Sequence, residues 1–136
     1  MLEYICYKFV NSPLTFLEAL YNCTNDGADL LSIDNGYENN WIYQSLSYTK
    51  KQYWIGYSTL FTGGQYFVWT NHSQSNYTNW VAANGSTYDS TYIDMSCSGC
   101  WRPESGLIFP KNYICSKDEP RLSAQLGVLT GVKRLE

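Results

Sequence analysis

Apolar residues between Thr15 and Gly27 recur with the spacing of an α-helix. Positions i, i+3, i+4 and i+7 are occupied by Phe16, Ala19, Leu20 and Cys23. Residues at these positions share one side of a helix, so the pattern predicts a helix with one buried face. Thr15 and Glu18 have the spacing of a capping box at the start of this helix, and Gly27 is placed to end it.

A short strand and a second helix are predicted next. Residues 28–33 form a short, largely apolar run, which is typical of a buried strand. Asn35 lies in a polar Asp-Asn-Gly segment that is suited to capping a helix. After it, helical spacing returns in Tyr37, Trp41, Ile42, Ser45 and Leu46.

The rest of the pattern favours β-structure. Aromatic and apolar residues predict a strand over 4–9, which Asn11-Ser12-Pro13 should end. Further strands are predicted at 53–57, 66–69, 92–96, 101–102 and within 107–115. Between Trp69 and Tyr92 the chain is polar and contains glycine. This segment is too long for an ordinary connection, and such loops in compact domains are usually functional.

Length and charge restrict the possible functions. The chain has 136 residues, which is enough for one domain with its own core. Its net charge is -3 and 15% of its residues are charged. Nucleic acid is therefore not an expected partner, because phosphate backbones require clustered Lys and Arg. No run reaches the roughly 18 apolar residues that cross a bilayer, so membrane insertion is not expected either.

Cysteines and glycosylation sequons indicate an oxidising compartment. Five cysteines occur together with four sequons, which begin at Asn22, Asn71, Asn76 and Asn84. We therefore predict a secreted or extracellular glycoprotein, although residues 1–4 lack the layout of a signal peptide. The predicted glycan acceptors are Asn71, Asn76 and Asn84, because Asn22 lies inside the first helix beside a cysteine.

Four blocks of sequence carry a family resemblance. In order, they are residues 15–23, residues 27–33, Trp54-Ile55-Gly56-Tyr57 and Tyr113-Ile114-Cys115. Together they resemble a C-type lectin-like domain. The resemblance implies an α+β fold over residues 1–116, with two helices flanking small antiparallel sheets and a long loop region. Residues 117–136 would then be a C-terminal tail that the fold does not need, and we expect it to be partly disordered or vector-derived.

The resemblance also assigns cysteines. By family position, Cys23 on the first helix and Cys115 on the last strand form a disulfide. The family's second disulfide needs cysteines near Ile93 and Ser105, and neither place has one. Cys97 and Cys100 instead flank a two-residue turn, and we predict a local disulfide there. The alternatives for this motif are a redox-active thiol pair and half of a zinc site. A zinc site would need two more ligands, for which Cys6 and His72 are the candidates.

Cys6 has no partner in this assignment. Its Cys-Tyr-Lys-Phe context resembles the second cysteine of an N-terminal hairpin in longer family members, whose partner would precede Met1. Truncation is the favoured explanation for this cysteine. The alternatives are an inert buried thiol and a link between two molecules.

The calcium motifs of sugar-binding family members are absent. Such members carry a Glu-Pro-Asn or Gln-Pro-Asp triplet in the long loop, with the proline in cis, and a later Trp-Asn-Asp run. Here Trp80 is followed by residues 81–85 without a carboxylate or proline, and Trp101 is followed by Arg102 and Pro103. A fixed cation at a ligand position repels calcium. We expect no metal and no cofactor, although Asp89, Asp94 and Glu104 lie between Ile55 and Cys115.

The leading functional hypothesis is calcium-independent recognition of a protein ligand. The predicted contacts are Tyr77, Trp80, Tyr88, Tyr92 and Arg102, since Trp, Tyr and Arg dominate interface hot spots. Trp69 and Trp101 are interpreted as core residues beneath the loop. The alternative is calcium-independent glycan binding through aromatic stacking and the amides of Asn76, Asn79 and Asn84. An enzyme is not predicted, because His72 is the sole histidine and has no acidic residue beside it in sequence.

Overall fold

The computed structural model describes residues 3–81, 88–120 and 132–134. The helices are α1 (Phe16–Asn25) and α2 (Gly36–Leu46), with short 3-10 helices η1 (Ser47–Thr49), η2 (Leu60–Thr62) and η3 (Met95–Cys97). The strands are β1 (Glu3–Leu14), β2 (Asp29–Leu30), β3 (Gln52–Ser58), β4 (Val68–Trp69), β5 (Ser90–Asp94), β6 (Cys100–Glu104), β7 (Lys111–Pro120) and β8 (Val132–Arg134). The α+β class expected from the sequence is confirmed.

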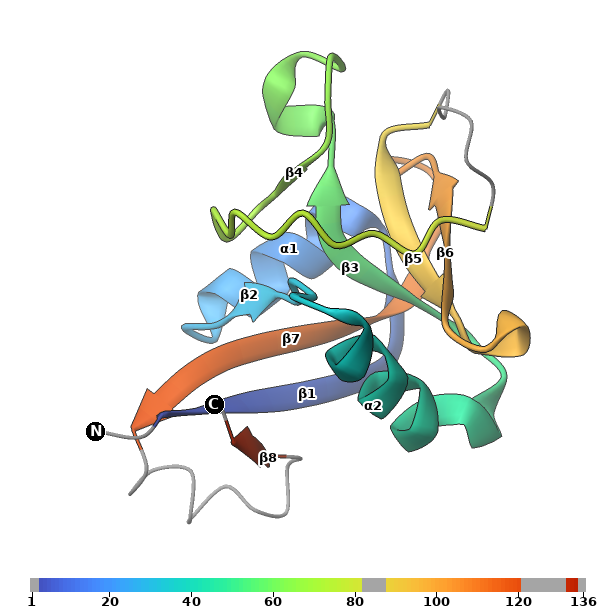
Figure 1. Ribbon diagram of the computed structural model, residues 1–136. Helices are drawn as coiled ribbons and strands as arrows, with labels where there is room; N and C mark the ends of the chain where they lie inside the picture. The colour runs from blue at the N-terminus through green and yellow to red at the C-terminus, as the bar shows by residue number, and fades with distance from the viewer. Residues whose placement is uncertain (1–2, 82–87, 121–131, 135–136) are drawn as a thin grey trace.

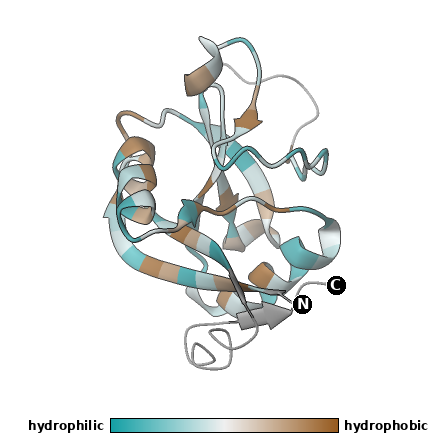
Figure 2. Ribbon diagram, turned by 90° about the vertical axis from the view of Figure 1, so that its left-hand side faces the viewer, coloured by the Kyte–Doolittle hydropathy of each residue, from teal (hydrophilic) through white to brown (hydrophobic). Residues whose placement is uncertain are grey.

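The strands form one mixed sheet (Figure 1). Its hydrogen-bonded order is β6-β5-β3-β7-β1-β8, with β2 paired to β7 and β4 paired to β3. The pairing of β3 with β7 is parallel and joins two antiparallel regions into a single sheet. Figure 2 shows hydrophobic and polar segments mixed along the long strands. The central strands β3 and β5 are largely buried along their length.

Both predicted helix starts are confirmed. The Thr15 hydroxyl accepts a hydrogen bond from the Glu18 backbone N–H, while the Glu18 carboxylate accepts one from the Thr15 backbone N–H at 2.9 Å. The side chain of Asn35 accepts from the Glu38 backbone N–H at 2.8 Å. These bonds satisfy N–H groups that have no partner inside the helix. After α1, Gly27 takes a φ of 73°, a left-handed conformation that glycine adopts without steric cost.

Two strands differ in extent from their sequence predictions. Strand β1 does not end at Asn11-Ser12-Pro13 but continues to Leu14, because a register shift between Val10 and Leu14 accommodates these residues against β7. The predicted strand at 28–33 is shortened to β2. Beyond β2, Leu31 still donates its backbone N–H to Ile114 at 3.0 Å, so the segment follows the sheet without a regular ladder.

Strand β3 is buried on both of its faces. Trp54 packs with Phe16, Ala19 and Cys23 in the core beneath α1, whereas Tyr53 and Ile55 belong to the second core, which α2 covers. The next residue, Gly56, has no room for a side chain, since an added Cβ would lie 2.8 Å from Thr70 Oγ1 and 3.0 Å from Leu30 O. The Trp-Ile-Gly block therefore reflects the crowding at the centre of the sheet.

The two predicted disulfides are present. Cys23 on α1 is joined to Cys115 on β7, which ties the first helix to the last long strand. Cys97 and Cys100 are joined across the turn between β5 and β6. Their sulfur atoms are thus bonded to each other, and the structure holds them as neither a free redox pair nor zinc ligands. Cys6 is half-buried on β1.

Beyond residue 116 the chain still takes part in the sheet. Strand β7 continues to Pro120, and β8 pairs with β1 through Tyr4 and Arg134, Ile5 and Lys133, and Cys6 and Val132. Residues 121–131 and 135–136 lie outside the described part of the chain, so the expectation of partial disorder in the tail is not addressed by these pairings.

A buried hydrogen bond joins β1 to α2. The hydroxyl of Tyr7 donates to the carboxylate of Glu38, which also accepts from the Asp34 backbone N–H at 2.8 Å. Both side chains are almost fully buried. Burial, followed by the negative charge of Glu38, raises the pKa of Tyr7 above its ordinary value of 10.0. Folding therefore favours the neutral phenol.

We expect removal of the Cys23–Cys115 disulfide by alanine substitution at both positions to lower the free energy of unfolding by about 4 to 5 kcal/mol. The estimate follows from the loss of loop-closure entropy for a sequence separation of 92. The same treatment of Cys97 and Cys100, with a separation of 3, should cost about 2 kcal/mol. Urea unfolding of both double variants measures the difference, and equal losses would contradict the prediction.

Tyr7→Phe should destabilise the domain at neutral pH by about 1 to 3 kcal/mol, because the buried Glu38 carboxylate loses a donor. The raised pKa of Tyr7 stabilises the fold fully below the unfolded-state pKa of about 10, and this contribution is lost as the pH rises above it. Urea unfolding at neutral pH and at about pH 11 should therefore show a smaller alkaline loss in Tyr7→Phe than in the unmodified protein. Tyr48→Phe, at a position 79% exposed, is the control and should leave the alkaline loss unchanged.

Candidate functional site

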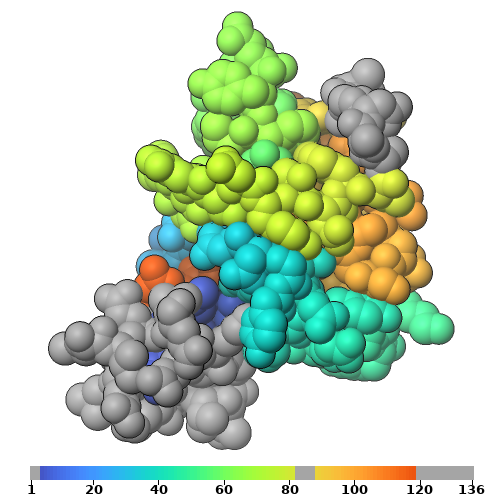
Figure 3. Space-filling view, viewed as in Figure 1, coloured from blue at the N-terminus to red at the C-terminus, as the bar shows by residue number. Residues whose placement is uncertain are grey.

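The segment from Thr70 to Val81 crosses one face of the molecule between η2 and α2. Figure 3 shows it as a continuous band above α2. Hydrogen bonds hold the band in place: Asn71 Nδ2 donates to Ser32 Oγ at 2.8 Å, and Ser75 Oγ donates to Ile33 O at 3.0 Å. The long loop predicted from the sequence is thus fixed to the scaffold over this part of its length.

Three partly exposed aromatic rings, Tyr57, Phe67 and Trp80, form a group that we call the aromatic ledge. Tyr57 and Phe67 stack with ring centroids 5.1 Å apart, and Trp80 lies 5.2 Å from Phe67 and 6.0 Å from Tyr57. Each ring is half-buried. Contacts of this kind contribute about 0.5 to 1.5 kcal/mol per pair beyond their buried area. The ledge is therefore a packed surface and not a set of independent side chains.

Two buried tryptophans support the ledge. Trp69 is 3% exposed and lies 4.4 Å from the Tyr57 ring, and Trp101 is fully buried and lies 6.0 Å from Trp80. The indole N–H of Trp101 donates to Asn39 Oδ1 at 2.8 Å, which fixes its ring orientation from α2. The interpretation of Trp69 and Trp101 as core residues beneath the loop agrees with this burial.

Backbone pairing places Trp80 beside β6. The Val81 N–H donates to Trp101 O at 2.9 Å, and the Trp101 N–H donates to Asn79 O at 2.9 Å. The side chain of Asn79 also donates to Gly99 O at 3.0 Å. The end of the described loop therefore runs along β6 as a short parallel bridge, and Trp80 is held in register with Trp101.

The predicted contact residues fall on two different faces of the sheet. Tyr77 packs edge-on against Trp101, at 5.7 Å, and so lies with Trp80 on the side of the ledge. Arg102 follows Trp101 in β6 and points to the opposite face, because successive strand residues alternate. Tyr92 pairs with Arg102 in the ladder and shares that opposite face. Tyr88, which is 50% exposed, lies just before β5.

Tyr92 and Arg102 have structural partners. Tyr92 is 7% exposed, and Lys111 Nζ lies 4.1 Å from its ring centroid. Burial raises the pKa of the Tyr92 phenol and lowers the pKa of Lys111. Arg102 Nε lies 3.1 Å from Asp94 Oδ2 in an ion pair. The structure therefore does not bring these two residues together with the ledge.

Two of the three carboxylates near the loop serve internal contacts. Asp89 accepts hydrogen bonds from Ser90 Oγ and from the Gly106 backbone N–H. Asp94 accepts from the backbone and hydroxyl of Ser96 and pairs with Arg102. Within residues 3–81, 88–120 and 132–134, no group of three His, Cys, Asp or Glu side chains is arranged to hold a metal ion.

Sequence reasoning missed Tyr57 and Phe67 as surface residues. Both were interpreted as parts of strands, and a strand pattern does not distinguish a covered ring from a half-covered one. The signal that was available is that three of the four residues in 66–69 are aromatic. His72 does not join the ledge and instead lines an apolar pocket between α1 and η2.

The sequons differ in access. The side chain of Asn76 is exposed, whereas that of Asn71 is half-buried and bonded to Ser32. Asn22 donates its side-chain amide to the hydroxyl of Tyr113. Asn84 lies outside the described residues. Glycan acceptance at Asn71, Asn76 and Asn84 remains a prediction.

Comparison with known proteins identifies the family. The model of the Lectin C-type domain matches residues 12–117, so the chain belongs to the C-type lectin domain family. Together with the disulfide between α1 and β7, this membership defines a recognition module of the C-type lectin type. Among the described residues, no helix has the length and apolar character of a membrane span.

Relatives occur among large receptors. The chain is 33% identical to human (Homo sapiens) C-type mannose receptor 2 over 125 residues, which cover 88% of this chain and 8% of the receptor. It is 31% identical to the rabbit (Oryctolagus cuniculus) secretory phospholipase A2 receptor over 112 residues, or 80% of this chain and 7% of the receptor. The chain thus spans less than a tenth of these relatives.

A solved structure shares the fold. A calcium-independent type II antifreeze protein superimposes with a TM-score of 0.72 at 22% identity, covering 83% of this chain and 85% of that protein. At this identity the likeness shows the fold alone. It confirms the C-type lectin-like architecture expected from the four sequence blocks.

After expression in a glycosylating host, Asn76 should carry an N-glycan at higher occupancy than Asn71, because Asn76 is exposed whereas Asn71 is half-buried and bonded to Ser32. Asn22 should carry none, because it lies within α1 and its amide is bonded to the hydroxyl of Tyr113. Enzymatic deglycosylation in ¹⁸O water followed by peptide mass spectrometry measures occupancy at each site. Asn76→Gln is the matched control and should abolish the label at that position. Full occupancy at Asn22 would contradict the prediction.

Proposed function

We propose that this domain is an extracellular recognition module that binds a protein ligand without calcium through the aromatic ledge. The observation that carries the proposal is the contrast between the half-exposed rings of the ledge and the acidic side chains in and next to β5, which have partners inside the domain. The rings of Tyr57, Phe67 and Trp80 remain half-exposed, while Asp89 and Asp94 accept hydrogen bonds from within the domain.

The ledge has the properties of an interface hot spot. Its rings are held by Trp69 and Trp101, and Trp80 is fixed by backbone pairing to β6. Binding therefore requires little ordering of side chains, which reduces the entropic cost of association. Trp and Tyr in packed central positions supply most of the binding energy in many interfaces. Val81, which is exposed beside Trp80, extends the apolar area available to a partner.

Calcium independence is supported by charge. Calcium is held by six to eight oxygen atoms, several of them carboxylates. Asp94 is buried and paired with Arg102, so recruiting its oxygen atoms would break an ion pair and leave the cation close to the metal. The C-type lectin fold also occurs in a protein whose structure is described as calcium-independent.

The names of the relatives frame the choice of ligand. The secretory phospholipase A2 receptor is named for a protein ligand, and C-type mannose receptor 2 is named for a sugar. Two disulfides favour an extracellular location, because disulfides persist in oxidising compartments. A purely binding role, without catalysis, accords with membership of this family.

Glycan binding without calcium is the alternative. The half-exposed ring of Trp80 would stack on a sugar, but Asn79, one of the amides assigned to sugar contacts, is bonded to Gly99 O. Asn76 remains exposed, and Asn84 lies outside the described residues. A sugar bound to the ledge would therefore find an aromatic surface with fewer hydrogen-bonding groups than the sequence suggested. This favours the protein ligand.

We expect the domain to bind immobilised secretory phospholipase A2 equally in calcium and in EDTA, and to lose about 2 kcal/mol of binding free energy, or roughly thirtyfold in Kd, on Trp80→Ala. Surface plasmon resonance measures both effects. Mannosylated albumin, run in parallel, tests the glycan alternative.

Tyr48→Ala removes an exposed ring from η1 and is the matched control, so its Kd should not change. Melting temperatures of both variants separate lost contacts from lost folding. Binding to mannosylated albumin alone would favour the glycan alternative. Binding only in the presence of calcium, or a rise in melting temperature on adding calcium, would overturn the proposal.

A further inference from the structure

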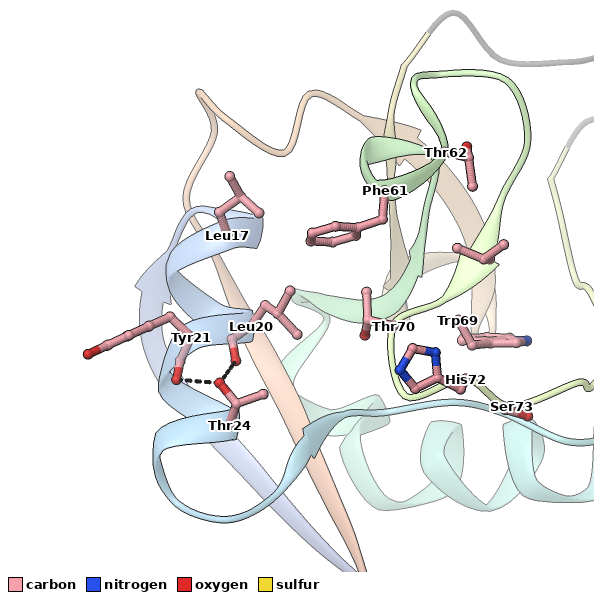
Figure 4. Close-up of a pocket in the computed structure, with 11 residues that line it drawn as sticks. Leu17, Leu20, Tyr21, Thr24, Phe61, Thr62, Trp69, Thr70, His72 and Ser73 are labelled. Atoms are coloured by element: carbon pink, nitrogen blue, oxygen red, sulfur yellow. Dashed lines mark hydrogen bonds between the residues drawn. The ribbon is translucent and has the colours of Figure 1, made fainter.

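An apolar pocket separates α1 from η2 and β4. Figure 4 shows Leu17 and Leu20 on the wall formed by α1 and Phe61 extending from η2 on the other side, while the ring of Tyr21, another lining residue, points outward from α1. The remaining lining residues are Thr24, Thr62, Val68, Trp69, Thr70, His72 and Ser73. The cavity volume is about 760 Å³. This is within the range of about 300 to 1,000 Å³ that is typical of small-molecule sites.

The pocket wall on α1 is a second apolar stripe. Leu17, Leu20, Tyr21 and Thr24 lie at positions i, i+3, i+4 and i+7, beside the stripe that fills the core. A helix that covers a sheet with one face normally carries polar residues on the other. Here Leu17 is 38% and Tyr21 is 71% exposed, and neither faces the core. The sequence of α1 therefore supplies more apolar surface than the fold itself buries.

The opposite wall shows the same excess. Phe61 is 60% exposed and stands on η2, which rises above the sheet with its hydrophobic residues, as seen at the top of Figure 2. Trp69 closes the inner side of the pocket with little exposure of its own. Exposed apolar residues from two elements distant in sequence thus line the same cavity. They form a contiguous apolar surface, unlike a single exposed apolar residue.

The lining also restricts the charge of an occupant. It contains no Asp, Glu, Lys or Arg, so an ionised ligand group would lose water without gaining a countercharge. The polar atoms are hydroxyl groups and the imidazole of His72 at one end. Past His72 and Ser73, a second pocket of about 270 Å³ contains Asp34 and Asp118, so carboxylates belong to a separate, polar space.

We propose that the pocket between α1 and η2 binds an uncharged lipophilic small molecule with more than one ring or an equivalent alkyl chain. A single aromatic side chain of a partner protein would leave most of the volume empty, which favours a whole small molecule over an inserted residue. The site is independent of the proposed protein ligand. Trp69 supports the ledge but is nearly buried, so ligand in the pocket and partner on the ledge contact different side chains.

N-phenyl-1-naphthylamine is a neutral probe of suitable size, and 8-anilinonaphthalene-1-sulfonate has the same ring system with a negative charge. We expect one saturable site for the neutral probe, seen as fluorescence enhancement, with at least about tenfold weaker binding of the sulfonate. His72 is the sole histidine and lies between this pocket and the polar pocket beside it, so its imidazole Hε1 resonance in proton NMR is a single signal that senses a ligand bound at this end of the cavity. That resonance should shift in proportion to occupancy.

Two variants test the walls. Phe61→Ala should weaken the neutral probe about tenfold through lost apolar contact, and Leu17→Glu should weaken it further by placing a charge in the wall. Leu17 is partly exposed, and circular dichroism with melting curves verifies that both variants fold. Tyr48→Ala is the control for an exposed ring elsewhere and should leave binding unchanged. None of these measurements depends on the ledge, so failure here leaves the proposed function standing.

The proposal is overturned if the neutral probe fails to saturate at one site, if it binds without moving the His72 resonance, or if Phe61→Ala and Leu17→Glu bind as well as the unmodified protein. Equal affinity for the neutral and sulfonated probes would also contradict it, since it would show that the lining does not discriminate charge.

Discussion

Strand β3 has a covered surface on each side, and the organisation of the molecule follows from this constraint. Trp54 points into the core beneath α1, whereas Tyr53 and Ile55 point into the core that α2 and the long loop cover. Because successive side chains along a strand point to opposite faces, neighbouring residues of β3 join different cores. The same alternation holds in β5 and β6, where the side chains of Trp101 and Arg102 lie on opposite faces of the sheet.

This separation gives the two sides of the sheet different characters. On the loop side, buried tryptophans carry the aromatic ledge, and contacts there are dispersive and aromatic. On the other side, Tyr92, Arg102, Lys111 and Asp94 form charge-assisted and cation–π contacts around the end of the sheet. Charged groups that pair with each other at the sheet have lower affinity for a metal or ligand, because a new partner must first replace an existing one.

The Cys23–Cys115 disulfide and the buried hydrogen bond between Tyr7 and Glu38 both join segments that are distant in sequence. The link from α1 to β7 joins segments 92 residues apart, and the bond from β1 to α2 joins the first strand to the second helix. Both restrain the elements that frame the long loop. A loop held on such a frame presents its rings in one arrangement, which lowers the ordering cost of recognition.

The sequence by itself determined the local elements and the family. The helix starts at Thr15 and Asn35, the Gly-dependent turn after α1 and the Cys23–Cys115 pairing were all predictable, because capping, glycine conformation and the family blocks are encoded over short stretches or fixed positions. The tertiary structure alone decided which aromatic residues are exposed. The sequence predicts both Tyr92 and Trp80 as contact residues, yet Lys111 lies over the ring of Tyr92, whereas the ring of Trp80 remains half-exposed on the ledge. It also decided that the second apolar stripe of α1 faces a pocket, because that depends on where η2, some forty residues later, comes to rest. Such outcomes depend on contacts between distant segments, and no local pattern records them.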